Sequence, residues 1–265
     1  MRERVIKVSQ QLGFRVTYSR LRDAYIRLGI RYTKQQYRYK IKDERRAALV
    51  QERLNYAVRL AELVCSKAPI IYFDETSFSN YLRPFKTWQR PKDPIKVNMP
   101  QKRLGGVTLF GAIGTCLPAP VFMTGESTNA KEVKKFMLKL ARELGAIGQF
   151  NDLKPWLVLD NHRAHFTREN KAIMELHFRL LPFPSSSCEF NAIEQLWGLV
   201  KQSFRKLMVQ KEHKVADSKE LATLVESAAL EIRPEVVQNV CNSNRKYILK
   251  MLEAKRDGTD LMHTV

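Results

Sequence analysis

Three acidic residues, Asp74, Asp160 and Glu194, have the types and settings that metal-dependent chemistry needs. Each aspartate follows a short apolar run, so both are expected where strands end, at the carboxyl edge of a sheet where α/β folds place ligands. Glu194 falls within a predicted helix, at the border of its apolar stripe. Three neighbouring carboxylates repel one another unless a cation joins them, which favours Mg²⁺ or Mn²⁺. Two such ions about 4 Å apart can activate a nucleophile and stabilise the leaving oxygen of a phosphodiester.

Each acid also has an ordinary structural interpretation. A strand-terminal aspartate often caps a turn, and a glutamate on an amphipathic helix usually faces solvent. The neighbouring residues also have two interpretations each. They could orient the carboxylates or contact phosphate, or they could only pack in the core or cap a turn. These neighbours are Asn161, His162, Arg163, His165 and Asn191, with Trp197 expected in the core and Lys201 a candidate DNA contact.

The composition favours a nucleic-acid partner. The 265 residues include 46 Lys and Arg against 27 Asp and Glu, a net charge of +19. Residues 1–68 carry 17 basic and 6 acidic side chains, so +11 of the total lies in the first quarter of the chain. Such a segment attracts a polyanion through phosphate contacts and counterion release. A merely soluble basic surface is the alternative.

The first 42 residues are expected to form part of a helix-turn-helix unit. Apolar residues at helical spacing predict one helix over 3–12, ended by Gly13, and a second that begins after a cap within Thr17–Ser19 and stops at Gly29. A third helix, which usually precedes these two in such domains, has no counterpart in this sequence, and an ordinary helical hairpin is the alternative. The residues expected to contact DNA here are Arg20, Arg22, Arg27, Arg31, Lys34, Arg38 and Lys40.

The rest of the chain predicts a linker helix over 43–68, an α/β domain over 69–210 and a C-terminal helical extension over 211–265 with two or three helices. Strands come first and helices later, which implies a mixed sheet flanked by helices. An apolar run over 105–123 carries four glycines and two prolines, so it is expected to be a buried hairpin and not a membrane span. The predicted strands are 70–73, 88–97, 107–113, 156–159 and 178–181, and the predicted helices of the α/β domain are 130–144, 168–176 and 191–207.

The four cysteines are far apart and form no paired motif. They predict neither a zinc site nor a disulfide framework, and they favour a reducing intracellular compartment. The charged N-terminus does not resemble a signal peptide.

The acids and their neighbours resemble the DDE signature of the Tc/mariner transposase superfamily, including its bacterial insertion-sequence relatives. The resemblance rests on Asp74-Glu75-Thr76, on Leu159-Asp160-Asn161 with His165, and on Leu181–Pro184 leading to Asn191–Trp197, and it extends to Asn244–Tyr247. It implies a ribonuclease H-like fold, Asp74, Asp160 and Glu194 as catalytic metal ligands, two Mg²⁺ or Mn²⁺ ions, and cut-and-paste DNA transposition.

Two departures accompany the resemblance. Asp74 and Asp160 are 86 positions apart, and Asp160 and Glu194 are 34 apart, one fewer than is common in the family. Cys188 and Ala192 stand where the family typically has prolines, which loosens the loop before Glu194.

The expected activity is therefore metal-dependent DNA strand cleavage and strand transfer at transposon ends. The expected partners are double-stranded DNA, as terminal inverted repeats and target, and a second copy of the chain, with no membrane and no small-molecule cofactor. The alternatives are a catalytically idle or domesticated DNA-binding remnant and a general ribonuclease H-like nuclease. The expected compartment is the nucleus in a eukaryote and the cytoplasm in a bacterium.

Overall fold

The computed structural model describes residues 2–28, 43–80, 104–147, 154–185, 187–211 and 215–256. It divides into two compact units, Met1–Lys42 and Asp43–Val265. The predicted strand over 88–97 lies outside the described residues, as do Arg31, Lys34, Arg38 and Lys40.

The described part of the first unit is a pair of helices. Helix α1 spans Arg2–Leu12, and Gly13 ends it with a φ of 68°, a left-handed conformation that glycine adopts without steric cost. Helix α2 spans Tyr18–Arg27, and the Thr17 hydroxyl caps it by accepting from the Arg20 amide at 3.4 Å. Both helices were predicted.

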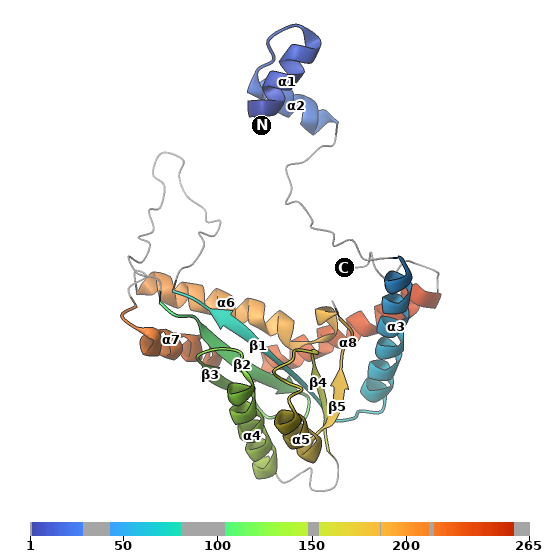
Figure 1. Ribbon diagram of the computed structural model, residues 1–265, viewed down its shortest axis with the longest axis vertical. Coiled ribbons are helices and arrows are strands. Elements are labelled where there is room, and N and C mark those ends of the chain that lie inside the picture. The colour runs from blue at the N-terminus through green and yellow to red at the C-terminus, as the bar shows by residue number, and fades with distance from the viewer. Residues whose placement is uncertain are drawn as a thin grey trace. The chain divides into compact units, whose positions relative to one another are not determined.

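The second unit is built on a five-stranded mixed sheet in the order β3-β2-β1-β4-β5 (Figure 1). Strand β1 pairs antiparallel with β2 and parallel with β4, and the predicted hairpin is the antiparallel pair β2–β3. The predicted mixed sheet flanked by helices is thus confirmed. The strands are β1 Ile70–Phe78, β2 Val107–Gly114, β3 Val121–Gly125, β4 Trp156–Leu159 and β5 Arg179–Pro182.

Helices cover both faces of this sheet (Figure 1). Helices α4 (Ala130–Ile147) and α5 (Arg168–His177) pack on one face over a core that includes Phe73, Phe110 and Phe136. Helices α6 (Ile193–Gln210), α7 (Ser218–Leu230) and α8 (Pro234–Arg256) lie on the other. None of the helices in the described ranges is long and apolar enough to cross a membrane.

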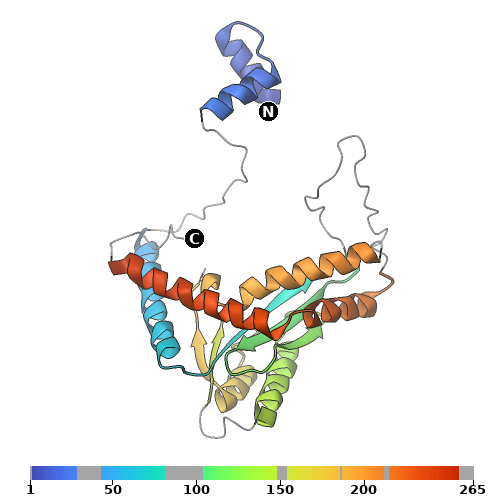
Figure 2. The same ribbon diagram turned by 180° about the vertical axis from the view of Figure 1, so that it is seen from behind.

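Helix α3 (Asp43–Cys65), predicted as a linker, packs against α8, and Figure 2 shows the two helices crossing each other. Its buried Leu54, Ala57 and Leu60 share one hydrophobic core with α6, α7 and α8. The helices on either side of the predicted α/β domain therefore close one face of its sheet. The predicted division of this unit at residues 68 and 210 remains a prediction.

Candidate active site

Asp74 and Asp160 lie side by side because their spacing in the chain equals the register of two strands. Strands β1 and β4 pair in parallel with Ile70 opposite Trp156 and Tyr72 opposite Val158, an offset of 86 residues. The same offset places Asp160 opposite Asp74, one step past the last residue of β4. Neighbouring strands are about 4.8 Å apart, so the two acids sit at one point of the sheet edge.

The prediction that Asp74 ends its strand was wrong. Strand β1 continues to Phe78, because β2 pairs with it along that whole length, with Asp74 opposite Gly111 and Phe78 opposite Val107. Only the β4 side of β1 becomes free at Asp74. The acid is therefore held by a strand that is hydrogen-bonded on one side and open on the other.

Glu194 comes to the same place from the first turn of α6. This helix begins at Ile193, two residues later than predicted, and buries the expected stripe of Ile193, Leu196, Trp197, Val200 and Phe204. Glu194 itself is exposed at the border of that stripe. Asp74, Asp160 and Glu194 all line one open pocket of about 360 Å³, together with Asn161, His162 and Cys188.

The carboxylates in this pocket repel one another. Burial raises the pKa of Asp74 to about 7, with the charges of Glu194 and Glu75 adding to it, while the Trp197 hydrogen bond opposes the rise. Burial also raises the pKa of Glu194; the Lys201 charge opposes this and the Asp160 charge adds to it. A cation among these oxygens would remove the repulsion.

Trp197, expected only as a core residue, also positions Asp74. Its side chain is 3% exposed, and its Nε1 donates to Oδ2 of Asp74 at 3.0 Å. The sequence does contain a sign of this role. Trp197 follows Glu194 by about one helical turn, so the two side chains lie on neighbouring parts of the helix surface.

His165 positions Asp160 from the opposite side. Its ring is fully buried between two acids, with Nδ1 2.9 Å from Oδ1 of Asp160 and Nε2 3.0 Å from Oε2 of Glu75. Burial lowers the pKa of His165, but its bonds to Asp160 and Glu75 outweigh this and raise the pKa to about 10. Burial raises the pKa of Asp160, but its hydrogen bond to His165 and the charge of that ring outweigh this and hold the pKa below its usual value.

Glu75 was not singled out as a site residue from the sequence. Successive residues of a strand face opposite sides, so Asp74 faces α6 while Glu75 faces the α4 and α5 side, where His165 lies. Its position next to Asp74 was visible in the sequence, but its partner is 90 positions away.

The two predicted asparagines bond main-chain carbonyls near the acids. Nδ2 of Asn161 donates to the Phe183 carbonyl and Nδ2 of Asn191 to the Phe73 carbonyl, both at 2.9 Å. Asn191 thus fixes the start of α6 to β1, directly beside Asp74. The amide of His162 donates to Oδ1 of Asp160 at 3.1 Å.

Helices α3 and α8 fix the turn that precedes Glu194. Arg53 of α3 forms an ion pair with Glu189, and Nδ2 of Asn244 in α8 donates to the Glu189 and Phe190 carbonyls at 3.2 and 3.3 Å. Glu189 and Phe190 belong to a short 3₁₀ helix, η1 (Cys188–Phe190). The segment with the two departures from the family pattern is therefore held by side chains from outside the predicted α/β domain.

The predicted DNA-contact residues that the structure describes lie in both units. Arg20, Arg22 and Arg27 are exposed on α2. Lys201 is half-buried on α6, close enough to Glu194 for its charge to act on that carboxyl.

The fold and the acidic pocket define a nuclease-type enzyme built on a mixed sheet. The sequence profile of the DDE superfamily endonucleases matches residues 69–220, and the chain belongs to this family. Comparison with curated protein sequences gave no match.

Solved structures of Mos1 transposase share the fold. The Mos1 strand transfer complex is 14% identical, with 91% of this chain and 70% of that chain covered and a TM-score of 0.63. The mariner Mos1 paired end complex with Mg is 13% identical, with coverages of 94% and 73% and a TM-score of 0.62. The corresponding complex with Mn is 15% identical, with coverages of 89% and 73% and a TM-score of 0.54. The DDE family that the resemblance implied is confirmed by the family match, and the implied fold is shared with the Mos1 structures.

Proposed function

We propose that this protein is a DNA transposase that cleaves DNA at transposon ends and transfers the freed 3′ end to target DNA. The observation that carries the proposal is the convergence of Asp74, Asp160 and Glu194 on one pocket, with Asp74 on β1 and Asp160 directly after the neighbouring parallel strand β4. The DDE endonuclease family and the basic N-terminal segment support it. The Mos1 structures with the same fold are complexes with transposon ends or of strand transfer.

The pocket suits divalent cations with oxygen ligands. It is lined by three carboxylates, and carboxylate oxygens are the ligands that Mg²⁺ and Mn²⁺ prefer. Asp74, Asp160 and Glu194 would hold Mg²⁺ or Mn²⁺, and such ions, when bound, activate a water or a 3′-hydroxyl for attack on phosphorus. Trp197 and His165 orient the two aspartates, and Lys201 adds positive charge for the DNA backbone.

The proposed partners are double-stranded DNA, as terminal inverted repeats and as target, and a second copy of the chain. Two transposon ends must be held together for transfer, which a homodimer would provide. The proposed compartment is the nucleus in a eukaryotic host and the cytoplasm in a bacterial one.

The test is a cleavage assay on duplexes that carry the inverted repeats flanking the coding region. We expect Mg²⁺- or Mn²⁺-dependent nicking at the repeat end, and joining of the 3′ end to a second duplex, with a scrambled duplex left uncut. Binding without cleavage in either metal would support a DNA-binding remnant instead. Faster cleavage of an RNA–DNA hybrid than of the repeat would point to a general nuclease.

The raised pKa of Asp74 predicts that metal binding strengthens with pH. Because that pKa is about 7, Asp74 must lose a proton before it can ligate, so Mn²⁺ affinity should fall about tenfold per pH unit below pH 7 and level off above it. The lowered pKa of Asp160 keeps that ligand ionised throughout the range. Without metal, the free energy of unfolding should decrease as the pH rises from the ordinary aspartate pKa of 3.8 to about 7 and level off above that, because the folded state holds the Asp74 proton more tightly than the unfolded chain does.

Titrations of Mn²⁺ at several pH values between about 6 and 8 check this expectation. The matched control is Asp74→Asn, which has no proton to lose and should bind Mn²⁺ weakly with a flat pH profile. An equally steep profile in that variant would assign the proton to another group.

A further inference from the structure

We propose that Glu75, His162 and His165 form a separate binding site for a transition metal of the Zn²⁺ class. His162 also lines the acidic pocket, whereas Glu75 lies on the opposite face of β1 from Asp74. Their ligand atoms all lie within 4.8 Å of one another, and they are the one such group of three that the described ranges contain. The proposal does not depend on transposition.

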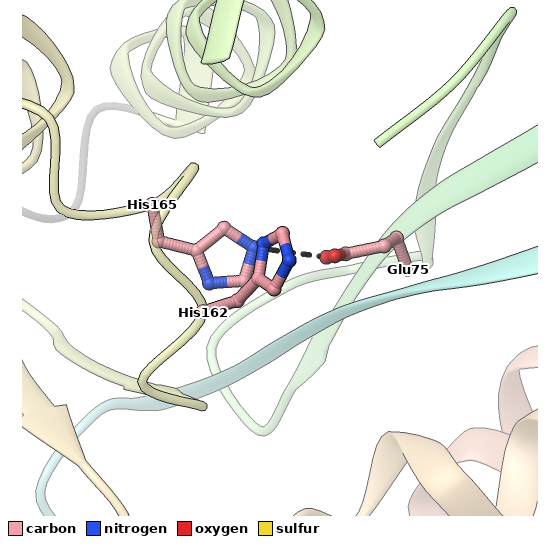
Figure 3. A group of neighbouring side chains, drawn as sticks. All are labelled: Glu75, His162 and His165. Atoms are coloured by element: carbon pink, nitrogen blue, oxygen red, sulfur yellow. Dashed lines mark hydrogen bonds and ion pairs between the residues drawn. The ribbon is translucent and has the colours of Figure 1, made fainter. Parts of the chain in front are cut away.

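The distances among these ligand atoms suit tetrahedral coordination. With Zn–N and Zn–O bonds of about 2.0–2.1 Å, two tetrahedral ligands are about 3.3 Å apart. Nε2 of His165 and Oε2 of Glu75 are already 3.0 Å apart. Figure 3 shows the two rings beside each other with the Glu75 carboxylate facing them, and the ring centroids are 5.5 Å apart. The ring nitrogen of His162 lies within 4.8 Å of both of these atoms, so the three ligand atoms surround one point.

Asp160 supplies the outer partner that metal-binding histidines usually have. Such a histidine donates its other ring N–H to a carboxylate, which fixes its tautomer and its orientation. Here Nδ1 of His165 is 2.9 Å from Oδ1 of Asp160, so Nε2 is the nitrogen aimed at Glu75. Binding of the metal replaces the proton between Nε2 and Glu75, and this proton is released to solvent.

The two neighbouring sites differ in the metals they favour. The acidic pocket offers carboxylate oxygens, which suit Mg²⁺ and Mn²⁺, whereas two imidazoles and one carboxylate suit Zn²⁺ and its neighbours in the first transition row. The site also has a closed side and an open side. His165 is fully buried and the Glu75 side chain is 11% exposed, while His162 is exposed and gives the ion a path from solvent.

The test uses Zn²⁺ titrations of the full chain, followed by calorimetry, with Mg²⁺ present throughout. We expect His162→Ala to weaken one Zn²⁺ site about a hundredfold, since loss of an outer partner alone costs about 10–100-fold. The matched control is His177→Ala, on the last turn of α5, which should bind Zn²⁺ like the unaltered chain. His162 is exposed, so its replacement leaves the fold intact.

Replacement of Zn²⁺ by Co²⁺ identifies the ligands. Tetrahedral Co²⁺ bound by nitrogen and oxygen gives visible absorption without the intense near-ultraviolet band that a thiolate ligand adds. Visible absorption that disappears in His162→Ala and persists in His177→Ala supports the site. Equal Zn²⁺ affinity in His162→Ala and the unaltered chain, or a thiolate band from one of the cysteines, would overturn it.

Discussion

Asp160→Asn is expected to abolish strand cleavage while leaving DNA binding intact. The amide has almost the same shape as the carboxylate but no charge, so it is a poor metal ligand and no longer gives the His165 ring a charged partner. Removal of a single hydrogen-bond donor to a transition state costs about 100–1,000-fold, and the loss of a charged metal ligand should cost at least about 1,000-fold in cleavage rate. Glu194→Gln should behave in the same way.

Cleavage of the terminal-repeat duplex and a gel-shift measurement with the same duplex separate the two effects. The matched control is Glu175→Gln on α5, an exposed acid whose Oε1 lies 3.7 Å from the Lys171 ammonium, which should leave cleavage unchanged. Undiminished cleavage by the Asp160→Asn protein would contradict the assignment of Asp160 to the active site. A parallel loss of binding would indicate damage to the fold and not to the chemistry.

The common location of Asp74 and Asp160 could be predicted from the sequence, but the strand register that brings them together could not. The apolar runs before Asp74 and Asp160 predicted two strands that place both acids at the carboxyl edge of a sheet, and the resemblance to a family implied that both acids are metal ligands. Only the sheet order shows that the 86-residue interval equals the register between β1 and β4. Strand order depends on which faces become buried together, and periodicity within a single segment does not encode this.

The contacts that orient the acids were the hardest to foresee. Glu75 meets His165 across 90 positions, and Arg53 meets Glu189 across 136. A glutamate within a strand and an arginine within a helix look like solvent-facing residues until their partners are known. The helical spacing of α6 did predict that Trp197 is buried, but not that its indole nitrogen would reach Asp74.

Gly111→Ala is expected to lower both stability and activity, because the residue opposite Asp74 leaves no room for a methyl group. A Cβ at this position of β2 would lie 2.5 Å from Cη2 of Trp197 and 3.1 Å from side-chain atoms of Ile193 and Phe122. Overpacking of this kind costs about 1–3 kcal/mol. For a chain of this size, each kcal/mol lowers the Tm by about 2–4 °C.

Movement of the Trp197 ring is the reason for the expected loss of activity. When Trp197 moves away from the new methyl group, its Nε1 leaves Oδ2 of Asp74, so the cleavage rate should fall by more than the unfolded fraction explains. The matched control is Gly198→Ala in α6, whose Cβ would meet nothing within 4 Å. This change should stabilise the helix by about 0.5–1 kcal/mol and leave cleavage unaltered.

The double variant Gly111→Ala with Trp197→Phe separates packing from positioning. The smaller ring makes room for the methyl group, so the Tm should recover part of its loss relative to Gly111→Ala alone. Phenylalanine has no N–H, so Asp74 still lacks its hydrogen bond and cleavage should stay low. Recovery of cleavage together with stability would mean that Trp197 acts only through packing, and that the indole bond to Asp74 contributes nothing to the reaction.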